Sequence, residues 1–211
     1  MVQKSTTEDG VRRGRGRPRG FDPDEVLDRA RDAFWNTGFA ATSLDDLATA
    51  TGLNRPSLYG AFGDKQALYL AALEKSRAEL TASLTAALAQ DEPLRAGLAR
   101  VYTAAAAIYA RGELGQRGCF LIGTAVTEAV ADPKIREALG QALSEIDEAF
   151  EARFRRAQAA GDLSRQADPA GLAKLATATL NGMAVRARAG GDQASLAAFG
   201  EALIGLICRL G

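Results

Sequence analysis

Three Asp-Pro pairs divide the chain, and each of them is a strong signal for the start of a helix. In such a pair the aspartate carboxylate can accept hydrogen bonds from free amides of the first helical turn, and proline suits the first helical position because it has no amide to leave unsatisfied. Alanine and leucine dominate the segments that follow, whereas valine and isoleucine are sparse, which disfavours strands. An all-α fold is therefore predicted from the pairs Asp22-Pro23, Asp132-Pro133 and Asp168-Pro169.

Helical spacing of apolar residues, together with glycines that can end a helix, predicts about nine helices. The first is expected to bury the face that carries Val26, Ala30 and Phe34 and to end at Gly38. Pro93 repeats the start signal less clearly. We expect helices over residues 23–37, 44–51, 55–61, 64–89, 93–111, 119–131, 133–160, 169–189 and 193–210.

Composition limits the classes of function. The 211 residues carry 26 Lys and Arg against 26 Asp and Glu, so any nucleic-acid surface requires a local concentration of positive charge. No apolar run approaches the roughly 18–20 residues that span a bilayer, and we expect no membrane partner. The N-terminus lacks the apolar core of a secretory signal, and two cysteines, Cys119 and Cys208, suit a reducing compartment. These features favour a cytoplasmic protein.

Catalysis has little support in the sequence. The chain contains no histidine, which is the most frequent general base and the most frequent metal ligand. No nucleophile–base pair, phosphate-binding loop or metal-binding cluster is recognisable. We therefore expect no enzyme activity, no cofactor and no metal, although an all-helical enzyme stays open as an alternative.

The first 21 residues form a basic arm without apolar periodicity, which we expect to be disordered when free. Within it, Arg15-Gly16-Arg17-Pro18-Arg19 resembles the core of an AT-hook, whose arginines follow a narrow A·T-rich minor groove. A generic basic tail is an equally good interpretation. If the arm dominates, the chain could be a non-specific architectural DNA binder, which is a second alternative function.

Two short helices joined by a glycine are predicted between residues 42 and 62. Ser43 can cap the first, with Asp46 three residues later in the position of a capping box. Gly52 can adopt the left-handed conformation that a tight turn requires, and Asn54 can cap the second helix, which has Pro56 in its first turn.

The apolar spacing in the same segment is that of a helix-turn-helix. Ala48 is small, as a closely crossing second helix requires, Gly52 follows four residues later, and Leu58 follows six residues after that. Leu47, Leu53 and Leu58 are expected to form the small core between the two helices. An ordinary helical hairpin uses the same chemistry and is the alternative.

The flanking residues extend this match into a family resemblance. The segment resembles the DNA-binding domain of the TetR/AcrR family of transcriptional regulators over about residues 22–70. The family implies a helix-turn-helix domain over 22–70, and a helical ligand-binding and dimerisation domain over 71–211. It further implies a repressor that binds a palindromic operator as a dimer and is released by a small-molecule effector. The matching residues are Gly38, Phe39, Thr42, Leu47, Ala48, Leu58, Tyr59, Phe62, Gly63, Asp64, Lys65 and Leu68.

The resemblance also implies which residues contact DNA. Thr42, Ser43 and Lys65 would contact phosphates, Tyr59 the DNA backbone, and the helix from Arg55 would lie in the major groove. Pro56 and Gly60 depart from the family pattern and leave few side chains that can reach bases; Arg55 could pair bidentately with guanine. The predicted DNA-binding set is Arg15, Arg17, Arg19, Thr42, Ser43, Arg55, Pro56, Ser57, Tyr59, Gly60 and Lys65.

In the second domain the resemblance implies a small-molecule pocket. For any single residue there, plain core packing is the more frequent explanation. Cys119 opens a predicted helix whose dipole would lower its pKa, so it could sense oxidants, although an inert buried cysteine is more common. The predicted pocket residues are Tyr102, Tyr109, Cys119, Phe120, Thr124, Glu128, Phe150 and Phe154.

The last two helices are apolar on more than one side, so something beyond their own neighbours in the chain must cover them. The resemblance implies a homodimer built from these two helices of each chain, while closure of the monomer core is the alternative. The predicted interface residues are Leu175, Met183, Leu196, Phe199, Leu203 and Leu206.

Overall fold

The computed structural model describes residues 20–111 and 117–209, and every regular element within these ranges is helical. A π-helix, η1 (Leu121–Ala125), directly precedes the short α6. The predicted all-α fold is confirmed, and most predicted bounds agree within a few residues. The α-helices are α1 (Pro23–Thr37), α2 (Leu44–Thr51), α3 (Arg55–Phe62), α4 (Lys65–Ala89), α5 (Leu94–Tyr109), α6 (Val126–Glu128), α7 (Pro133–Ala160), α8 (Pro169–Arg188) and α9 (Gln193–Ile207).

One expected helix has a different form. Residues 119–131 were expected to make one α-helix, but they contain η1 and the single turn of α6. At the start of this segment the Thr124 hydroxyl donates to the Phe120 carbonyl at 2.8 Å. Thr51 and Thr179 make the same bond inside regular α-helices, so this bond alone does not produce the π-helical turn.

The Asp-Pro pairs begin helices as predicted. In each pair the aspartate Oδ1 accepts a hydrogen bond from the backbone amide two residues later, at 2.9 Å for Asp22, 2.9 Å for Asp132 and 3.1 Å for Asp168. Pro93, the less clear signal, precedes α5 without a side-chain cap. None of the helices in the described ranges is long and apolar enough to cross a membrane.

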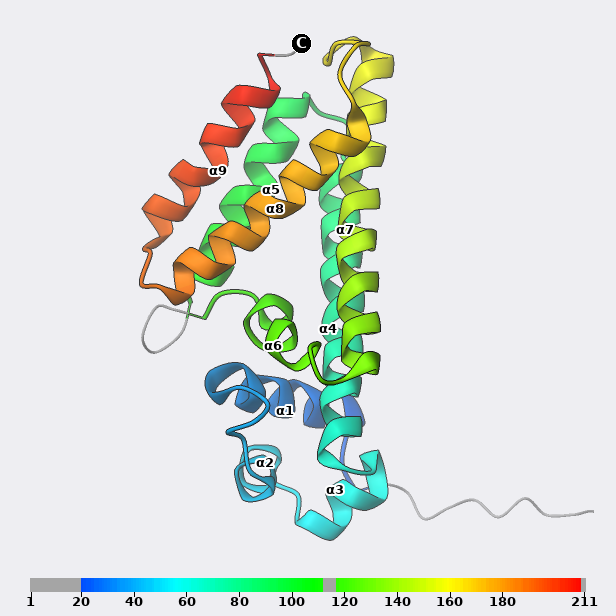
Figure 1. Ribbon diagram of the computed structural model, residues 1–211, viewed down its shortest axis with the longest axis vertical. Coiled ribbons are helices and arrows are strands. Elements are labelled where there is room, and N and C mark those ends of the chain that lie inside the picture. The colour runs from blue at the N-terminus through cyan, green and yellow to red at the C-terminus, as the bar shows by residue number, and fades with distance from the viewer. Residues whose placement is uncertain (1–19, 112–116, 210–211) are drawn as a thin grey trace, which may run out of the picture.

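The helices form an elongated molecule (Figure 1). The bundle of α1, α2 and α3 lies at one end, and α4 leads from it along the length of the molecule beside α7. At the other end α8 packs on α7, and α5 packs on α9. The segment of η1 and α6 lies between the two ends, where it contacts α1, α4, α7 and α8.

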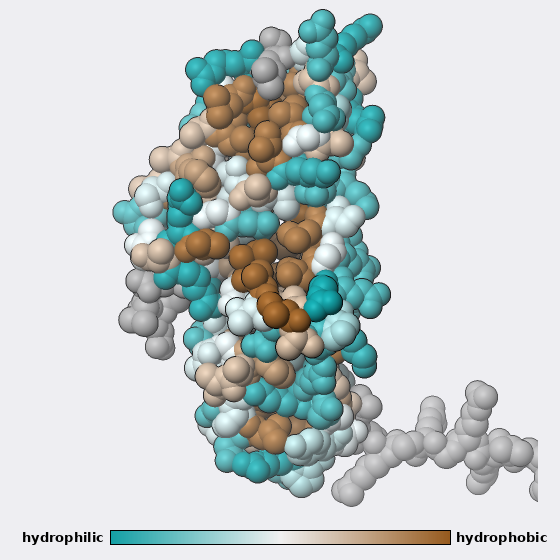
Figure 2. All heavy atoms as spheres, viewed as in Figure 1, coloured by the Kyte–Doolittle hydropathy of each residue, from teal (hydrophilic) through white to brown (hydrophobic). Residues whose placement is uncertain are grey.

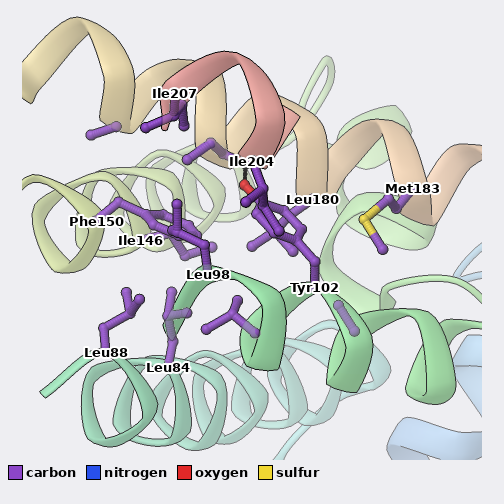
Figure 3. Close-up of a cluster of buried hydrophobic side chains, with 14 of the residues drawn as sticks. Leu84, Leu88, Leu98, Tyr102, Ile146, Phe150, Leu180, Met183, Ile204 and Ile207 are labelled. Carbon is purple, nitrogen blue, oxygen red and sulfur yellow. Dashed lines mark hydrogen bonds between the residues drawn. The ribbon is translucent and has the colours of Figure 1, made fainter. Parts of the chain in front are cut away.

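The larger hydrophobic core joins the five long helices of the second half, α4, α5, α7, α8 and α9. Figure 3 shows its side chains converging from all five. Tyr102 is buried there, and its hydroxyl donates to the Ala176 carbonyl at 3.0 Å. The labelled members are Leu84, Leu88, Leu98, Tyr102, Ile146, Phe150, Leu180, Met183, Ile204 and Ile207.

The smaller core belongs to the N-terminal bundle, but it does not end there. Phe34, Leu47 and Leu58 pack with the first turns of α4, and Phe120 of the middle segment and Ile135 of α7 belong to the same cluster. The N-terminal bundle therefore packs against η1 and α7 through one continuous apolar cluster.

Gly200 marks the closest approach of α9 to α5, and this contact gives a test of the packing. A Cβ added at Gly200 would lie 2.7 Å from Tyr102 Cβ, which side-chain rotation cannot move away, and 2.9 Å from Cγ. Gly200→Ala should therefore lower the free energy of unfolding, because overpacking typically costs about 1–3 kcal/mol. Denaturant unfolding followed by circular dichroism measures the change.

Gly140 on α7 provides the matched control, because a Cβ there meets no atom within 4 Å. Gly140→Ala should raise stability by about 0.5–1 kcal/mol, the usual gain in helix propensity. Equal stabilisation by the two substitutions would contradict the close α5–α9 contact.

Candidate nucleic-acid interface and internal cavity

Capping interactions build the helix-turn-helix as predicted. The Ser43 Oγ accepts a hydrogen bond from the Asp46 amide at 3.1 Å, and the Asp46 carboxylate accepts one from the Ser43 amide at 2.8 Å, which completes a capping box. The Ser43 hydroxyl also donates to the Asp46 carboxylate at 2.7 Å, and this bond together with that from the Ser43 amide lowers the pKa of Asp46. Gly52 has the left-handed φ of 71°, and Asn54 Oδ1 accepts from the Ser57 amide at 2.9 Å.

The interior of this unit also follows the sequence pattern. Leu47 and Leu58 are buried, Leu53 packs at their edge, and Ala48 is half-buried. Leu58 is turned inward, and most other positions of α3 face solvent at least in part. Arg55, Pro56, Tyr59 and Gly60 are exposed and Ser57 is half-buried.

Arg55 forms a two-pronged ion pair with Asp45 of α2. Its Nε donates to Asp45 Oδ1 at 2.8 Å, and its Nη2 lies 2.5 Å from Oδ2. The hydrogen bond and charge of Asp45 raise the pKa of the Arg55 guanidinium. Sequence reasoning identified Arg55 but missed Asp45, since nothing in the spacing of ten residues indicates that they meet.

Two residues expected to contact phosphate, Thr42 and Lys65, make contacts within the chain. Thr42 is buried, and its hydroxyl donates to the Gly38 carbonyl at 2.6 Å, so it shapes the α1–α2 connection and does not lie on the surface. The Lys65 ammonium lies 4.5 Å from the Phe39 ring centroid and 3.5 Å from the Ala40 carbonyl. Lys65 is half-buried, and Ser43 is exposed. The predicted arm residues Arg15, Arg17 and Arg19 lie outside the described residues.

A cavity of about 310 Å³ lies between α1, α4, α5, η1 and α8. Most of its wall is apolar. Three predicted pocket residues, Tyr109, Cys119 and Phe120, line it. The complete lining is Arg31, Trp35, Ser76, Glu79, Leu80, Ser83, Leu84, Ala87, Val101, Ala104, Ala105, Ile108, Tyr109, Cys119, Phe120, Leu121 and Leu180.

The other five predicted pocket residues lie elsewhere. Tyr102, Phe150 and Phe154 form a stacked row in the larger core, with successive ring centroids 6.3 and 6.2 Å apart. Thr124 is a buried residue of η1 and accepts a hydrogen bond from the Tyr69 hydroxyl at 2.7 Å. Glu128 is half-buried in α6, outside the cavity wall. The three rings lie outside the cavity because those of α5 and α7 stack on each other and fill the core between the two helices.

Residues of α1 and α4 complete the cavity wall, and sequence reasoning missed them. Trp35 follows the buried Phe34 on α1, is half-buried and packs at the edge of the same apolar cluster. A large apolar residue beside the buried stripe of Val26, Ala30 and Phe34 was the sequence signal that could have identified Trp35 as a cavity residue. Ser76 also lines the cavity, and its buried Oγ has no hydrogen-bond partner among the described residues.

The cavity is tied to α1 and α8 by a set of polar contacts around Trp35. The indole Nε1 donates to the Arg117 carbonyl at 2.8 Å, and the Arg117 guanidinium lies over the indole ring and pairs with Asp32 at 2.5 Å. From α8, Arg188 donates to the Trp35 carbonyl at 2.7 Å and to the Arg117 carbonyl at 3.0 Å. A displacement of Trp35 in the cavity wall would therefore disturb the hydrogen bonds that join α1 and α8.

The predicted interface residues divide into two groups. Met183 and Leu196 are completely buried within this chain. They pack in the larger core and cannot contact a partner chain. Phe199 and Leu203 are half-buried. Leu175 and Leu206 are 55% and 58% exposed, and Figure 2 shows apolar residues gathered over α8 and α9.

Comparison with known proteins finds relatives over most of the chain. The family model of bacterial regulatory proteins of the tetR family matches residues 26–72, and that of the tetracyclin repressor-like C-terminal domain matches residues 95–203. The HTH-type transcriptional repressor ComR of Escherichia coli (strain K12) is 31% identical over 181 residues, which are 85% of this chain and 86% of ComR.

Solved structures give the same picture. The TetR family transcriptional regulator CifR, in a complex with a 26-base-pair double-strand operator DNA, is 32% identical with a TM-score of 0.76, and the match covers 90% of this chain and 98% of CifR. The regulatory protein TetR from Rhodobacter sphaeroides is 25% identical with a TM-score of 0.76, over 86% of this chain and 96% of that protein.

The environment of Cys119 predicts low reactivity. Burial raises the pKa of its thiol more than hydrogen bonds with the Ile122 and Leu121 amides lower it. The thiolate is the reactive form, so iodoacetamide should label Cys119 more slowly in the folded chain than in the unfolded chain, and the labelling should accelerate at a higher pH. Mass spectrometry of the Cys119 peptide over a pH series measures both. Equal rates in the two states would contradict this environment.

Proposed function

The chain belongs to the TetR family of bacterial transcriptional regulators, and we propose that it is a repressor that binds a palindromic operator as a dimer. The family resemblance of the sequence is thereby confirmed. We propose further that a small molecule in the cavity between α1, α4 and α5 releases the operator. The exposed α3, with Arg55 and Tyr59 directed to solvent, is the observation that carries the proposal for DNA.

A recognition helix must be free on the side that enters the major groove. α3 fulfils this condition, because its buried residue Leu58 faces α2 and its polar and small residues face outward. CifR, which shares the fold over nearly its full length, is bound to operator DNA in its solved structure. For the arm, we propose that Arg15, Arg17 and Arg19 add phosphate or minor-groove contacts beside the site that α3 reads.

The dimer is proposed to form through the outer face of α8 and α9. Leu175, Val185 and Leu206 are large apolar side chains that are each more than half exposed on these two helices. Apolar residues grouped on a surface are typical of a protein–protein contact. A twofold dimer also explains how a small bundle reads DNA specifically, because two recognition helices bind two half-sites together.

Leu206→Glu should convert the dimer to a monomer, because it places a charge in an apolar contact. Sedimentation velocity gives the oligomeric state, and circular dichroism checks that the helices are intact. Val130→Glu is the matched control, since Val130 is 79% exposed but lies after α6, away from α8 and α9. A dimeric Leu206→Glu variant would place the interface elsewhere.

The cavity is proposed to bind an apolar effector that carries a hydrogen-bond acceptor. Its wall is mostly apolar, which favours a molecule of the same kind. The Ser76 hydroxyl is buried at the wall without a partner and could donate to such an acceptor. A ligand here would touch Trp35 of α1 directly, and Trp35 is bonded to Arg117 and Arg188. Binding can thus reposition α1 and, with it, the spacing of the two recognition helices.

Filling the cavity with a side chain should imitate the effector. Ala105 is buried in the wall, and Ala105→Phe places a ring into the space. We expect affinity for an operator selected from a random DNA library to fall by about 5–150-fold, the range typical of allosteric coupling. Fluorescence anisotropy measures the affinity. Thr103→Phe, exposed on the same helix and outside the wall, is the control. Unchanged affinity of the Ala105→Phe dimer would contradict the coupling.

A further inference from the structure

We propose that Asp45 determines sequence specificity by holding Arg55 in the orientation that reads guanine and by keeping it from binding phosphates. The inference rests on the proposed operator binding and deepens it. Asp45 is the second residue of α2, and Arg55 is the first residue of α3, so the turn at Gly52 brings the two together.

The geometry of the pair leaves the useful part of the guanidinium free. Asp45 takes the edge formed by Nε and Nη2, at 2.8 and 2.5 Å. An arginine has five N–H donors, and those of Nη1 together with the second hydrogen of Nη2 point away from Asp45. This end is the one that can donate two parallel hydrogen bonds to O6 and N7 of a guanine. Asp45 thus fixes the plane of the group and presents its free end.

Arg55 has no substitute on its helix. The sequence of α3 is RPSLYGAF, in which Arg55 is the one charged residue. Tyr59 lies one turn further along and is also exposed. Strong discrimination between bases by α3 therefore depends on how this one guanidinium is oriented.

Stability explains the position of Asp45 only in part, through the modest stabilisation that a carboxylate gives to the first turn of a helix. Its side chain is 73% exposed and that of Arg55 is 51% exposed. Exposed ion pairs contribute little to folding. A carboxylate on a surface that approaches DNA is repelled by phosphates, and a free arginine there would bind any phosphate regardless of sequence. The pair removes both effects, because it neutralises the charge and orients the donors.

Loss of Asp45 is expected to change base discrimination and unspecific DNA binding in opposite directions. Loss of Asp45 should weaken discrimination for guanine and strengthen binding to unrelated DNA. A well-oriented bidentate contact discriminates against wrong bases by about 5–150-fold, so the preference should fall from that range toward a few-fold.

The test selects binding sites from a random DNA library with the full-length chain and compares four proteins, namely the wild type, Asp45→Asn, Arg55→Ala and the double variant. We expect the wild type to enrich one guanine in each half-site, and Asp45→Asn to lose most of that preference. In the Arg55→Ala background, Asp45→Asn should leave base preference unchanged, because the residue that it orients is absent.

Two further variants separate geometry from charge and from folding. Glu25→Gln removes one negative charge from α1, where Glu25 pairs with Arg29, and should leave guanine preference intact. Asp45→Glu keeps the charge but moves the carboxylate, so it should lower guanine preference without increasing binding to unrelated DNA. Thermal unfolding by circular dichroism confirms that each variant is folded.

The outcomes distinguish this inference from the proposed function. A wild-type chain that enriches no sequence would overturn operator binding and the inference with it. An enriched site whose guanine preference survives Asp45→Asn would overturn the role of Asp45 alone. A selected site in which no guanine depends on Arg55 would do the same.

Discussion

The position of the helix-turn-helix depends on one buried side chain, Tyr69. Its ring packs against Phe34, Phe39 and Phe120 at centroid distances of 5.0, 4.8 and 6.0 Å, so it joins α1, the α1–α2 connection and the middle segment of the chain. Its hydroxyl donates to Thr124 at 2.7 Å, and burial raises its pKa to about 12, which keeps it neutral as a donor. The N-terminal bundle is thus held against the element that also forms the cavity wall, and any rearrangement of η1 changes the support of α1.

Much of the fold could be predicted because its signals are local. A capping aspartate and its proline, or Ser43 with Asp46, act within one helical turn, so the sequence alone reveals where helices begin. The cavity could not be predicted in the same way, because its wall comes from helices far apart in the chain. Phe120 and Phe150 carry the same apolar signal, yet one lines the cavity and the other fills the core. Only the relative rotation of the helices decides between them, and that depends on packing as a whole.

The C-terminal helices show the same limit in a different form. Because α8 is apolar around most of its surface, its sequence does not reveal which side faces the rest of the chain. In the structure Met183 is buried and Leu175 is exposed, although the sequence predicts both in the dimer interface. A helix that is apolar on two sides requires two partners. Within the chain α8 packs on α7, α9, α5 and η1, and the proposed dimer would cover the exposed side chains of Leu175 and Val185.

The distribution of charge explains why recognition of DNA has to be local. The chain as a whole is neutral, with 26 basic and 26 acidic residues, so it has no general attraction for phosphates. On the exposed surface of α3 the single guanidinium of Arg55 is already matched by a carboxylate. If α3 binds an operator as proposed, its affinity must therefore come from the fit of groups to bases, and the sequence-independent attraction is proposed to come from the arginines of the arm. In the proposed mechanism, loss of the fit between the two recognition helices and the operator would release α3 from DNA, because its one neutralised guanidinium adds little sequence-independent attraction.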